Sequence, residues 1–271
     1  MSITDREWRV IDEAARPGAV QMALDEVAAL TASEGGPATA RVYRWDPATV
    51  SLGYSQSVDV LDRSYCDRHG IDVTRRPTGG GTIYHDGTGD IAYSVVLPAS
   101  AVPGDLTESY RLLCEPLFDA LDRVGVDARF ADKPRPAVFD PACYLRAMHP
   151  AHDVVGPDGR KLAGNAQYRT REAVVQHGSL SFSRATATHL SVFDDAPVDA
   201  ETFEDRVGAV TEYVDCTREQ AVAALADALA DWTGGDAGEW TGPEREAARE
   251  RADRKFAADA WIEDREATLD A

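Results

Sequence analysis

The pattern of apolar and polar positions divides the chain into helical and strand-like segments. Residues 17–36 repeat apolar side chains at helical spacing and end at two glycines, which predicts a helix. Residues 106–126 form a longer amphipathic pattern, with Thr107 as its expected N-cap. A short helix is expected at 58–70. Residues 217–271 predict a helical tail, interrupted by one glycine-rich break, that belongs to the same domain.

Runs of β-branched and aromatic residues lie between these helices. Residues 40–56 and 81–98 each predict a β-hairpin, because two such runs flank a turn sequence. Residues 71–77 predict a strand, and residues 152–182 predict a meander of three strands. Helices interleaved with hairpins, without regular alternation of strand and helix, indicate an α+β fold with a mixed or antiparallel sheet flanked by helices. We expect residues 1–271 to form a single domain.

Acidic residues dominate the charge of the chain. Its 47 acidic residues outnumber 28 basic ones, which gives a net charge of −19. This balance argues against general nucleic-acid binding, because neutralising phosphates requires a basic face. Lysine is rare and occurs only at Lys133, Lys161 and Lys255. Acid-rich, lysine-poor usage suggests a halophilic protein of a high-salt cytoplasm, with GC-rich coding as the alternative explanation of the arginine preference.

The sequence gives no support for a membrane segment, a signal peptide or a metal site. No apolar run is long enough to span a bilayer, and the first ten residues lack the basic and apolar regions of a signal peptide. We therefore expect a cytoplasmic protein without membrane contact. The four cysteines stand far apart with no CxxC pair and no zinc-type spacing, so no metal site is expected.

One segment concentrates candidate chemistry. "RRPTGGGTIYHDGTGD", residues 75–90, combines two arginines, three consecutive glycines and a His-Asp pair. Glycines let backbone N–H groups approach an anion closely, and arginine binds phosphate through a planar fork. The segment is not a P-loop, because the residues after the glycines alternate like a strand instead of opening a helix with Lys-Ser/Thr. The sequence therefore predicts an anion-binding loop beside a strand.

Taken with other segments, this motif identifies a family. "RRPTGGGTIYHD", "GDIAYSVV" and "GRKLAGNAQYRTREAVVQHGSL", together with "QMALDEV", "YRWDPATVSLGYSQ" and "RKFAADAW", resemble the lipoate–protein ligase A and octanoyltransferase branch of the biotin/lipoate ligase superfamily. The resemblance implies a mixed sheet flanked by helices. It also implies activation of lipoate or octanoate by ATP to an acyl-AMP, followed by transfer to a lysine of a carrier domain.

The resemblance assigns roles to individual residues. Lys161 would contact both the acyl carbonyl and the phosphate, and its fixed charge would stabilise the transition state. His85 and His177 are either site residues or structural histidines, and His177 would orient the target lysine. The remaining residues implied to contact the nucleotide, the acyl-adenylate or the acyl chain are Arg76, Gly79, Gly80, Gly81, Thr82, Ile83, Tyr84, Gly164 and Ala166.

Cys143 keeps a second activity open. Some octanoyltransferases of the superfamily carry an acyl-accepting cysteine a short distance before the "GRKLAG" motif and need no ATP. Those transferases commonly have arginine after two glycines, whereas this chain has Gly81, so the sequence favours the ligase. Cys143 is otherwise a small loop hydrophobe. Biotin ligation is disfavoured because the GRGRxGR-type loop is missing, and a non-catalytic acyl-binding or carrier-binding protein is a more distant alternative.

Cofactors and partners follow from the same resemblance. A ligase would use ATP, with Mg²⁺ held largely by phosphate and water, and lipoate as substrate. The expected acceptors are the lipoyl domain of a 2-oxoacid dehydrogenase E2 component or the glycine cleavage H protein. "RKFAADAW" is followed by only ten residues, so we expect the accessory C-terminal domain of many bacterial ligases to be absent. A separate small accessory subunit would then supply it.

Overall fold

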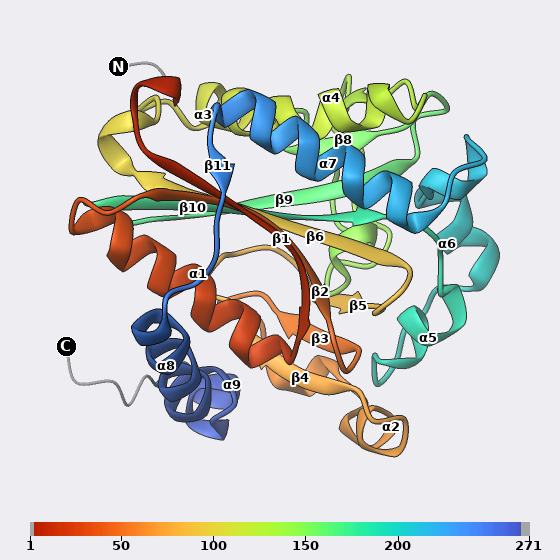
Figure 1. The fold of residues 1–271 in the computed structure, drawn as a ribbon. Coiled ribbons are helices and arrows are strands. Elements are labelled where there is room, and N and C mark those ends of the chain that lie inside the picture. Colours follow the sequence, from red (N-terminus) through yellow and green to blue (C-terminus); the bar gives the residue numbers. More distant parts are fainter. Residues whose placement is uncertain (1–2, 267–271) are drawn as a thin grey trace.

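The computed structural model describes residues 3–266 and has an α+β fold with two sheets (Figure 1). Within these residues the larger sheet has eight strands, and only β11–β1 and β1–β2 are parallel pairs. Its strands are, in spatial order, β11 (Asp236–Ala237), β1 (Trp8–Arg16), β2 (Ala38–Trp45), β6 (Asp90–Pro98), β10 (Ala173–Ser181), β9 (Lys161–Arg169), β8 (Asp153–Val155) and β7 (Arg129–Phe130). The predicted mixed sheet is confirmed.

A smaller sheet lies against one part of the larger one. In the described chain it consists of β4 (Asp72–Arg75), β3 (Thr49–Leu52) and β5 (Ile83–His85), with β3 in the middle. β3 runs parallel to β4 and antiparallel to β5. Its apolar side packs with α2 (Arg63–Arg68), α5 (Thr186–Ser191), α6 (Ala200–Arg206) and α9 (Asp259–Asp264) into one apolar cluster.

Helices cover both faces of the larger sheet (Figure 1). On one face lie α3 (Leu106–Leu113), α4 (Glu115–Arg123) and α7 (Arg218–Thr233), whose apolar side chains form one core with the sheet. On the other face lies α1 (Gly18–Ser33), followed at the C-terminal end by α8 (Gly242–Arg251) and a π-helical turn, Ala252–Phe256. No helix within residues 3–266 is long and apolar enough to cross a membrane.

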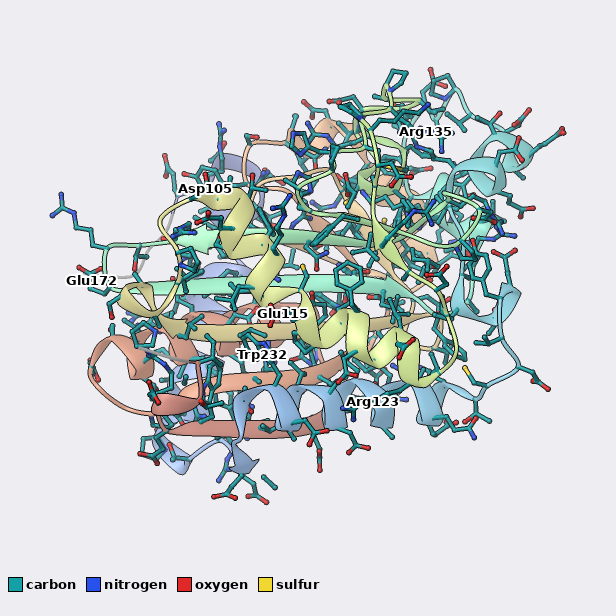
Figure 2. The ribbon with its side chains drawn as sticks, turned by 90° about the horizontal axis from the view of Figure 1, so that it is seen from above. Asp105, Glu115, Arg123, Arg135, Glu172 and Trp232 are labelled. Carbon is teal, nitrogen blue, oxygen red and sulfur yellow. The ribbon has the colours of Figure 1, made fainter. Side chains whose placement is uncertain are left out.

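The helix ends show how local sequence sets these elements. Thr217 caps α7 by accepting from the Gln220 N–H, and the Gln220 side chain accepts from the Thr217 N–H in return. Gly234 ends the helix with φ of 62°, a conformation that glycine adopts at little cost. Where α4 meets α7, Arg123 binds Asp231 at 2.7 Å and the Trp232 indole donates to Glu115 at 2.9 Å; Figure 2 labels Arg123, Trp232 and Glu115.

Most predicted helices and the meander are confirmed. The predicted helix at 17–36 is α1, the tail contains α7, α8 and α9, and the strands of the meander are β8, β9 and β10. The end of the predicted tail, 267–271, lies outside the described residues. The single helix predicted at 106–126 is wrong, because it divides into α3 and α4 at Cys114, just before Pro116. Asp105, not Thr107, caps α3.

Both predicted hairpins are wrong. The two strands of residues 40–56 enter different sheets, because β2 pairs with β1 and β6 while β3 pairs with β4 and β5. Residues 81–98 divide in the same way between β5 and β6. Alternation and turn residues report that a strand is buried and where it ends, but they do not specify its partner. The separation of these strands leaves a cavity between the two sheets, to which β2, β3 and β5 each contribute side chains.

Candidate active site

A cavity of about 510 Å³ lies between the two sheets. Its walls come from β9 and β10 of the larger sheet, β3 and β5 of the smaller sheet, and the segment 134–153. Apolar side chains line part of it, among them Met22, Tyr43, Trp45, Ile83 and Met148. This volume and mixed lining are typical of a pocket for a small organic ligand.

Lys161, at the start of β9, lies on this cavity and is 3% exposed. Its Nζ donates to Oδ1 of Asp153 at 2.7 Å and to the carbonyl oxygen of Cys143 at 3.0 Å. A methyl group built on Gly164 would lie 3.4 Å from the Cys143 Sγ and 3.6 Å from the Lys161 Nζ. The ammonium group and the thiol therefore flank the same small space beside Gly164.

Electrostatics keep this lysine charged. Burial by itself lowers the pKa of Lys161, but the neighbouring Cys143 and Asp153 outweigh that effect and raise it above its ordinary value. Burial raises the pKa of Asp153, and the Lys161 ammonium more than offsets this and holds it well below its usual range. The pair is therefore ionised near neutral pH, and Lys161 is a fixed positive charge next to a thiol.

The three glycines pass directly against the segment that carries Cys143. The Cys143 N–H donates to the Thr82 carbonyl at 2.8 Å, and a methyl group on Gly81 would lie 2.7 Å from the Cys143 nitrogen. Gly80 has φ of 97°, which other residues rarely adopt. Glycine at 80 and 81 thus sets the path of this loop and the position of Cys143, whereas a methyl group on Gly79 would meet nothing within 4 Å.

Arg76 holds the glycine loop from inside. It is buried, and its guanidinium donates to the carbonyls of Ser51, Gly79 and Gly81 at 2.8, 3.0 and 2.5 Å. Burial lowers the pKa of Arg76 to about 10. The neighbouring Arg75 is also buried and donates to the carbonyls of Gly53 and Tyr54, which follow β3, and of Trp261 in α9. Both arginines thus use their donors on the protein's own backbone, although Arg76 also faces the cavity.

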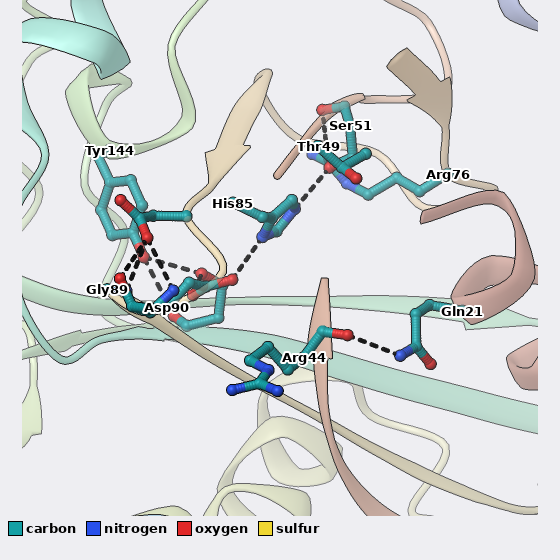
Figure 3. Close-up of polar contacts among 12 residues, drawn as sticks. Gln21, Arg44, Thr49, Ser51, Arg76, His85, Gly89, Asp90 and Tyr144 are labelled. Atoms are coloured by element: carbon teal, nitrogen blue, oxygen red, sulfur yellow. Dashed lines mark hydrogen bonds and ion pairs between the residues drawn. The ribbon is translucent and has the colours of Figure 1, made fainter. Parts of the chain in front are cut away.

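His85 belongs to a buried hydroxyl–imidazole–carboxylate chain (Figure 3). Its Nδ1 lies 2.6 Å from Oδ2 of Asp90, and its Nε2 lies 2.9 Å from the Ser51 hydroxyl. The ring stacks on Trp45 with centroids 4.0 Å apart. Burial lowers the pKa of His85 despite the Asp90 charge, so the ring is neutral near pH 7. On this assignment Nδ1 donates to Asp90 and Nε2 accepts from Ser51, which also contacts Arg76.

His177, on β10, forms a second chain of the same type on the opposite wall. Its Nε2 lies 2.7 Å from the Thr78 hydroxyl, and its Nδ1 lies 3.5 Å from Oδ2 of Asp25. Asp25 is buried in an ion pair of 2.7 Å with Arg41. Burial raises the pKa of Asp25, and the Arg41 charge and the contact with His177 lower it further than burial raises it. This chain fixes the start of the glycine loop to α1.

The structure brings most of the predicted site residues to one cavity. Those that line it are Arg76, Gly79, Gly80, Gly81, Ile83, His85, Cys143, Lys161, Gly164, Ala166 and His177. Thr82 and Tyr84 do not line it. Because side chains alternate along β5, Tyr84 points to the other side of the small sheet, and the buried Thr82 hydroxyl donates to Gln56 at 2.8 Å.

Several cavity residues carried no clear signal in the sequence. Asp153 and Ser51 lie within strand-like runs, and only the folded sheet brings them to Lys161 and His85. His149 and His152 also line the cavity, with their rings stacked at 5.2 Å. The cluster "HPAHD" could have drawn attention to them, since it gathers two histidines and an acid just before a strand.

Comparison with known proteins assigns the family. The family model described as the lipoyl protein ligase A/B catalytic domain matches residues 17–230. The chain belongs to this family. The predicted resemblance is therefore confirmed, and the matched region contains every residue of the cavity.

Relatives within the family carry a transferase name. An octanoyltransferase LipM from Kyrpidia tusciae is 34% identical over 270 residues, which cover 94% of this chain and 97% of the relative. A LipM from Geobacillus kaustophilus is 37% identical over 181 residues, covering 64% of each chain. The chain is thus an enzyme of the lipoate ligase and octanoyltransferase family, and these relatives favour the transferase over the ligase.

Solved structures of similar fold carry a ligase name. A bi-partite lipoate protein ligase from Thermoplasma acidophilum, described with its E2 lipoyl domain, superposes with a TM-score of 0.78 at 26% identity. The superposition covers 98% of this chain and 100% of the other. A lipoate-protein ligase A bound with ATP gives the same TM-score and identity over 94% and 98% of the two chains. The predicted fold class is confirmed.

Proposed function

We propose that this protein transfers an octanoyl group from a thioester donor to a lysine of a lipoyl carrier domain, with Cys143 as the intermediate acceptor. The observation that carries the proposal is the Cys143 thiol on the cavity wall beside the charged Lys161. The LipM name of relatives that align along nearly the whole chain supports the same assignment.

The reaction would take place in two balanced steps. The Cys143 thiolate attacks the donor carbonyl, the carbon–sulfur bond to the donor breaks, and the donor leaves as a thiol after taking a proton. The neutral amine of the target lysine then attacks the acyl-Cys143 carbonyl, loses a proton and expels the cysteine thiolate. The products are an amide on the carrier domain and free enzyme, so no ATP is consumed.

Lys161 would act by charge. Its ammonium group lies close to the reacting atoms, where a fixed positive charge stabilises negative charge that develops on the substrate carbonyl. Two of the three N–H groups of Lys161 have partners among residues 3–266, Asp153 and the Cys143 carbonyl, and the third is available to the developing oxyanion. Because its ion pair with Asp153 keeps it protonated, Lys161 serves as an electrostatic catalyst and not as the base.

The acyl chain would lie along the apolar wall of the cavity. Met22, Tyr43 and Trp45 line this wall, and the glycine at 164 leaves space beside the sulfur. A linear eight-carbon chain gains free energy from every methylene removed from water, about 0.8 kcal/mol each. The absence of a side chain at Gly164 leaves the reacting carbonyl room between the thiol and the ammonium.

ATP-dependent ligation of lipoate is the second candidate. It is favoured by Gly81, where octanoyltransferases of the superfamily commonly have arginine, and by the similarity to ligase structures. This reading would require ATP with Mg²⁺, and the cations Arg76 and Lys161 would face the phosphates. It would also fit a separate accessory subunit, since the similar Thermoplasma ligase is described as bi-partite. A cytoplasmic, high-salt setting and an E2 or H-protein acceptor are proposed for either activity.

A donor test separates the two activities. Purified protein and a lipoyl domain are mixed with octanoyl-acyl carrier protein in one reaction and with lipoate plus Mg-ATP in the other, and the carrier mass is measured. We expect the lipoyl domain to gain the mass of one octanoyl group in the first reaction. When the lipoyl domain is left out of that reaction, we expect an acyl adduct to remain on Cys143. Cys143→Ser should lose at least about 10³-fold in rate. Mass gain only with lipoate and ATP, undiminished in Cys143→Ser, would establish the ligase instead.

A further inference from the structure

The segment 133–149 forms one rim of the cavity and also carries Cys143. Pro134, Arg146 and Met148 line the cavity. The backbones of Arg135 and Met148 bind each other through two hydrogen bonds of 3.2 and 2.9 Å. Lys133 and Arg135 therefore flank a residue of the cavity lining, Pro134, and the Arg135 guanidinium donates to the Gly159 carbonyl at 3.3 Å.

The rim carries positive charge that the rest of this acidic protein does not neutralise. Lys133 is exposed and Arg135 is partly buried. Across residues 3–266 neither pairs with a carboxylate, although the chain has 47 acidic residues. Asp132, just before the segment, pairs instead with Arg129, and Asp140, within it, pairs with Arg146, each at 3.4 Å.

One further cation, Arg206, packs against the rim. Arg206 is buried and donates to the carbonyls of Pro136 and Arg146 at 3.0 and 2.9 Å, so it supports the rim from below. Burial lowers the pKa of Arg206, and the nearby Arg135 lowers it further. The positive charges of Arg135 and Arg206 repel each other. An anion bound next to them would reduce that repulsion.

We propose that Lys133 and Arg135, named here the basic rim, bind the phosphodiester of a phosphopantetheine arm as an acyl carrier protein presents its thioester to Cys143. This proposal rests on the transferase function proposed above. With the thioester inside the cavity and the carrier outside, the arm must cross the rim. Its phosphodiester is the only charged group along the arm, and guanidinium and ammonium groups are suited to it.

The basic rim would also offset an unfavourable encounter. The chain has a net charge of −19, so an anionic phosphodiester approaching it at random is repelled. A local positive patch next to the cavity lining would direct an anionic arm toward the cavity, and it would raise the association rate without taking part in the chemistry.

A substrate series tests the proposal with the double variant Lys133→Gln/Arg135→Gln. The donors are octanoyl-acyl carrier protein, octanoyl-coenzyme A, which has phosphates but no carrier protein, and octanoyl-N-acetylcysteamine, which has neither. The matched control is Arg171→Gln, an exposed arginine in the β9–β10 turn; its neighbour Glu172 lies far from Arg135 in Figure 2. Lys133→Gln alone removes an exposed side chain and keeps the test valid if the double variant folds poorly.

We expect the double variant to raise KM about tenfold for the two phosphate-bearing donors, with kcat unchanged and with weaker salt dependence than the parent. The rate of the double variant with octanoyl-N-acetylcysteamine should stay within about twofold of the parent rate. The rates of the Arg171→Gln variant with all three donors should do the same. Equal changes for all three donors, no change, or a change confined to the carrier protein would overturn the phosphodiester site. If the parent protein uses no thioester donor and the double variant binds Mg-ATP more weakly than the parent, the proposed function is wrong. The basic rim then binds the phosphates of a nucleotide.

Discussion

Two buried lysines, Lys161 and Lys255, each form an ion pair of 2.7 Å with one carboxylate, Asp153 and Glu26 respectively. Both ammonium groups also lie near an aromatic ring, 5.7 Å from Tyr144 for Lys161 and 4.5 Å from Trp261 for Lys255. Both occur in segments that resemble family motifs. Burial, pairing and motif therefore do not distinguish them.

The difference lies in what else each lysine faces. Lys161 opens on the cavity beside Cys143, whereas Lys255 does not line the cavity and joins the C-terminal turn to α1. Next to Lys255, the Trp261 indole donates to the Arg75 carbonyl at 2.8 Å, which ties α9 to β4. The "RKFAADAW" segment thus holds parts of the fold together, and the "GRKLAG" segment places a charge on the cavity beside Cys143.

The largest expected effect separates these two lysines by activity. Lys161→Ala removes the fixed charge beside the thiol and the oxyanion, so acyl transfer should fall about 10²–10³-fold. Lys255→Ala should change the rate of the folded protein by less than about threefold. The measurement is transfer from octanoyl-acyl carrier protein to a lipoyl domain well below the melting temperature. Equal losses in the two variants would remove the distinction drawn here.

A pair of glycine variants tests whether the close contact between Gly81 and Cys143 positions the cysteine. Gly81→Ala places a methyl group 2.7 Å from the Cys143 nitrogen, so the cysteine must shift, and misplacement by about 1 Å can cost about 10²-fold in rate. Gly79→Ala, with nothing within 4 Å, is the matched control and should keep most activity. Rates of Cys143 acylation in a single turnover give the comparison. An active Gly81→Ala enzyme would show that the contact does not position the nucleophile.

Stability should show the opposite ranking of the two lysines. Lys255→Ala leaves Glu26 without its closest partner and removes the contact with the Trp261 ring, so we expect a loss of about 1–3 kcal/mol in the free energy of unfolding. Urea denaturation followed by circular dichroism measures it. An unchanged midpoint would mean that the Lys255 contacts do not hold the C-terminal turn in place.

A smaller effect should appear in the stability of the protein at acidic pH, through the ion pair that joins α8 to β1. Glu244, on α8, binds Arg9 at 2.6 Å; burial raises its pKa, but Arg9 and other donors lower it to about 2. Because its pKa is lower in the folded protein, ionised Glu244 stabilises the fold at pH values above its ordinary pKa of 4.5. That stabilisation is lost as the pH falls from 4.5 toward about 2. The difference in unfolding free energy between the parent and Glu244→Gln should therefore narrow over this range. A constant difference would contradict the assigned pKa.

Local sequence was sufficient for the elements whose signals are local. The helix α1 and the capped helix α7 follow from apolar spacing and from Thr217 and Gln220, because a helix closes its hydrogen bonds within its own segment. The meander β8–β9–β10 follows for a similar reason, since short turns join neighbouring antiparallel strands. β1 was not predicted, because its first four residues are all buried and show no alternation.

By itself the sequence determined the family, the α+β class and the segments that meet at the site, since motif identity and order are properties of the chain. The tertiary structure decided which side chains share the cavity. It paired β2 and β3 into different sheets, brought Asp153 to Lys161, and turned Thr82 and Tyr84 away from the predicted nucleotide contact. The physical reason is that strand partners and ion pairs are set by contacts between distant residues, whose free energy depends on the packing of the whole core.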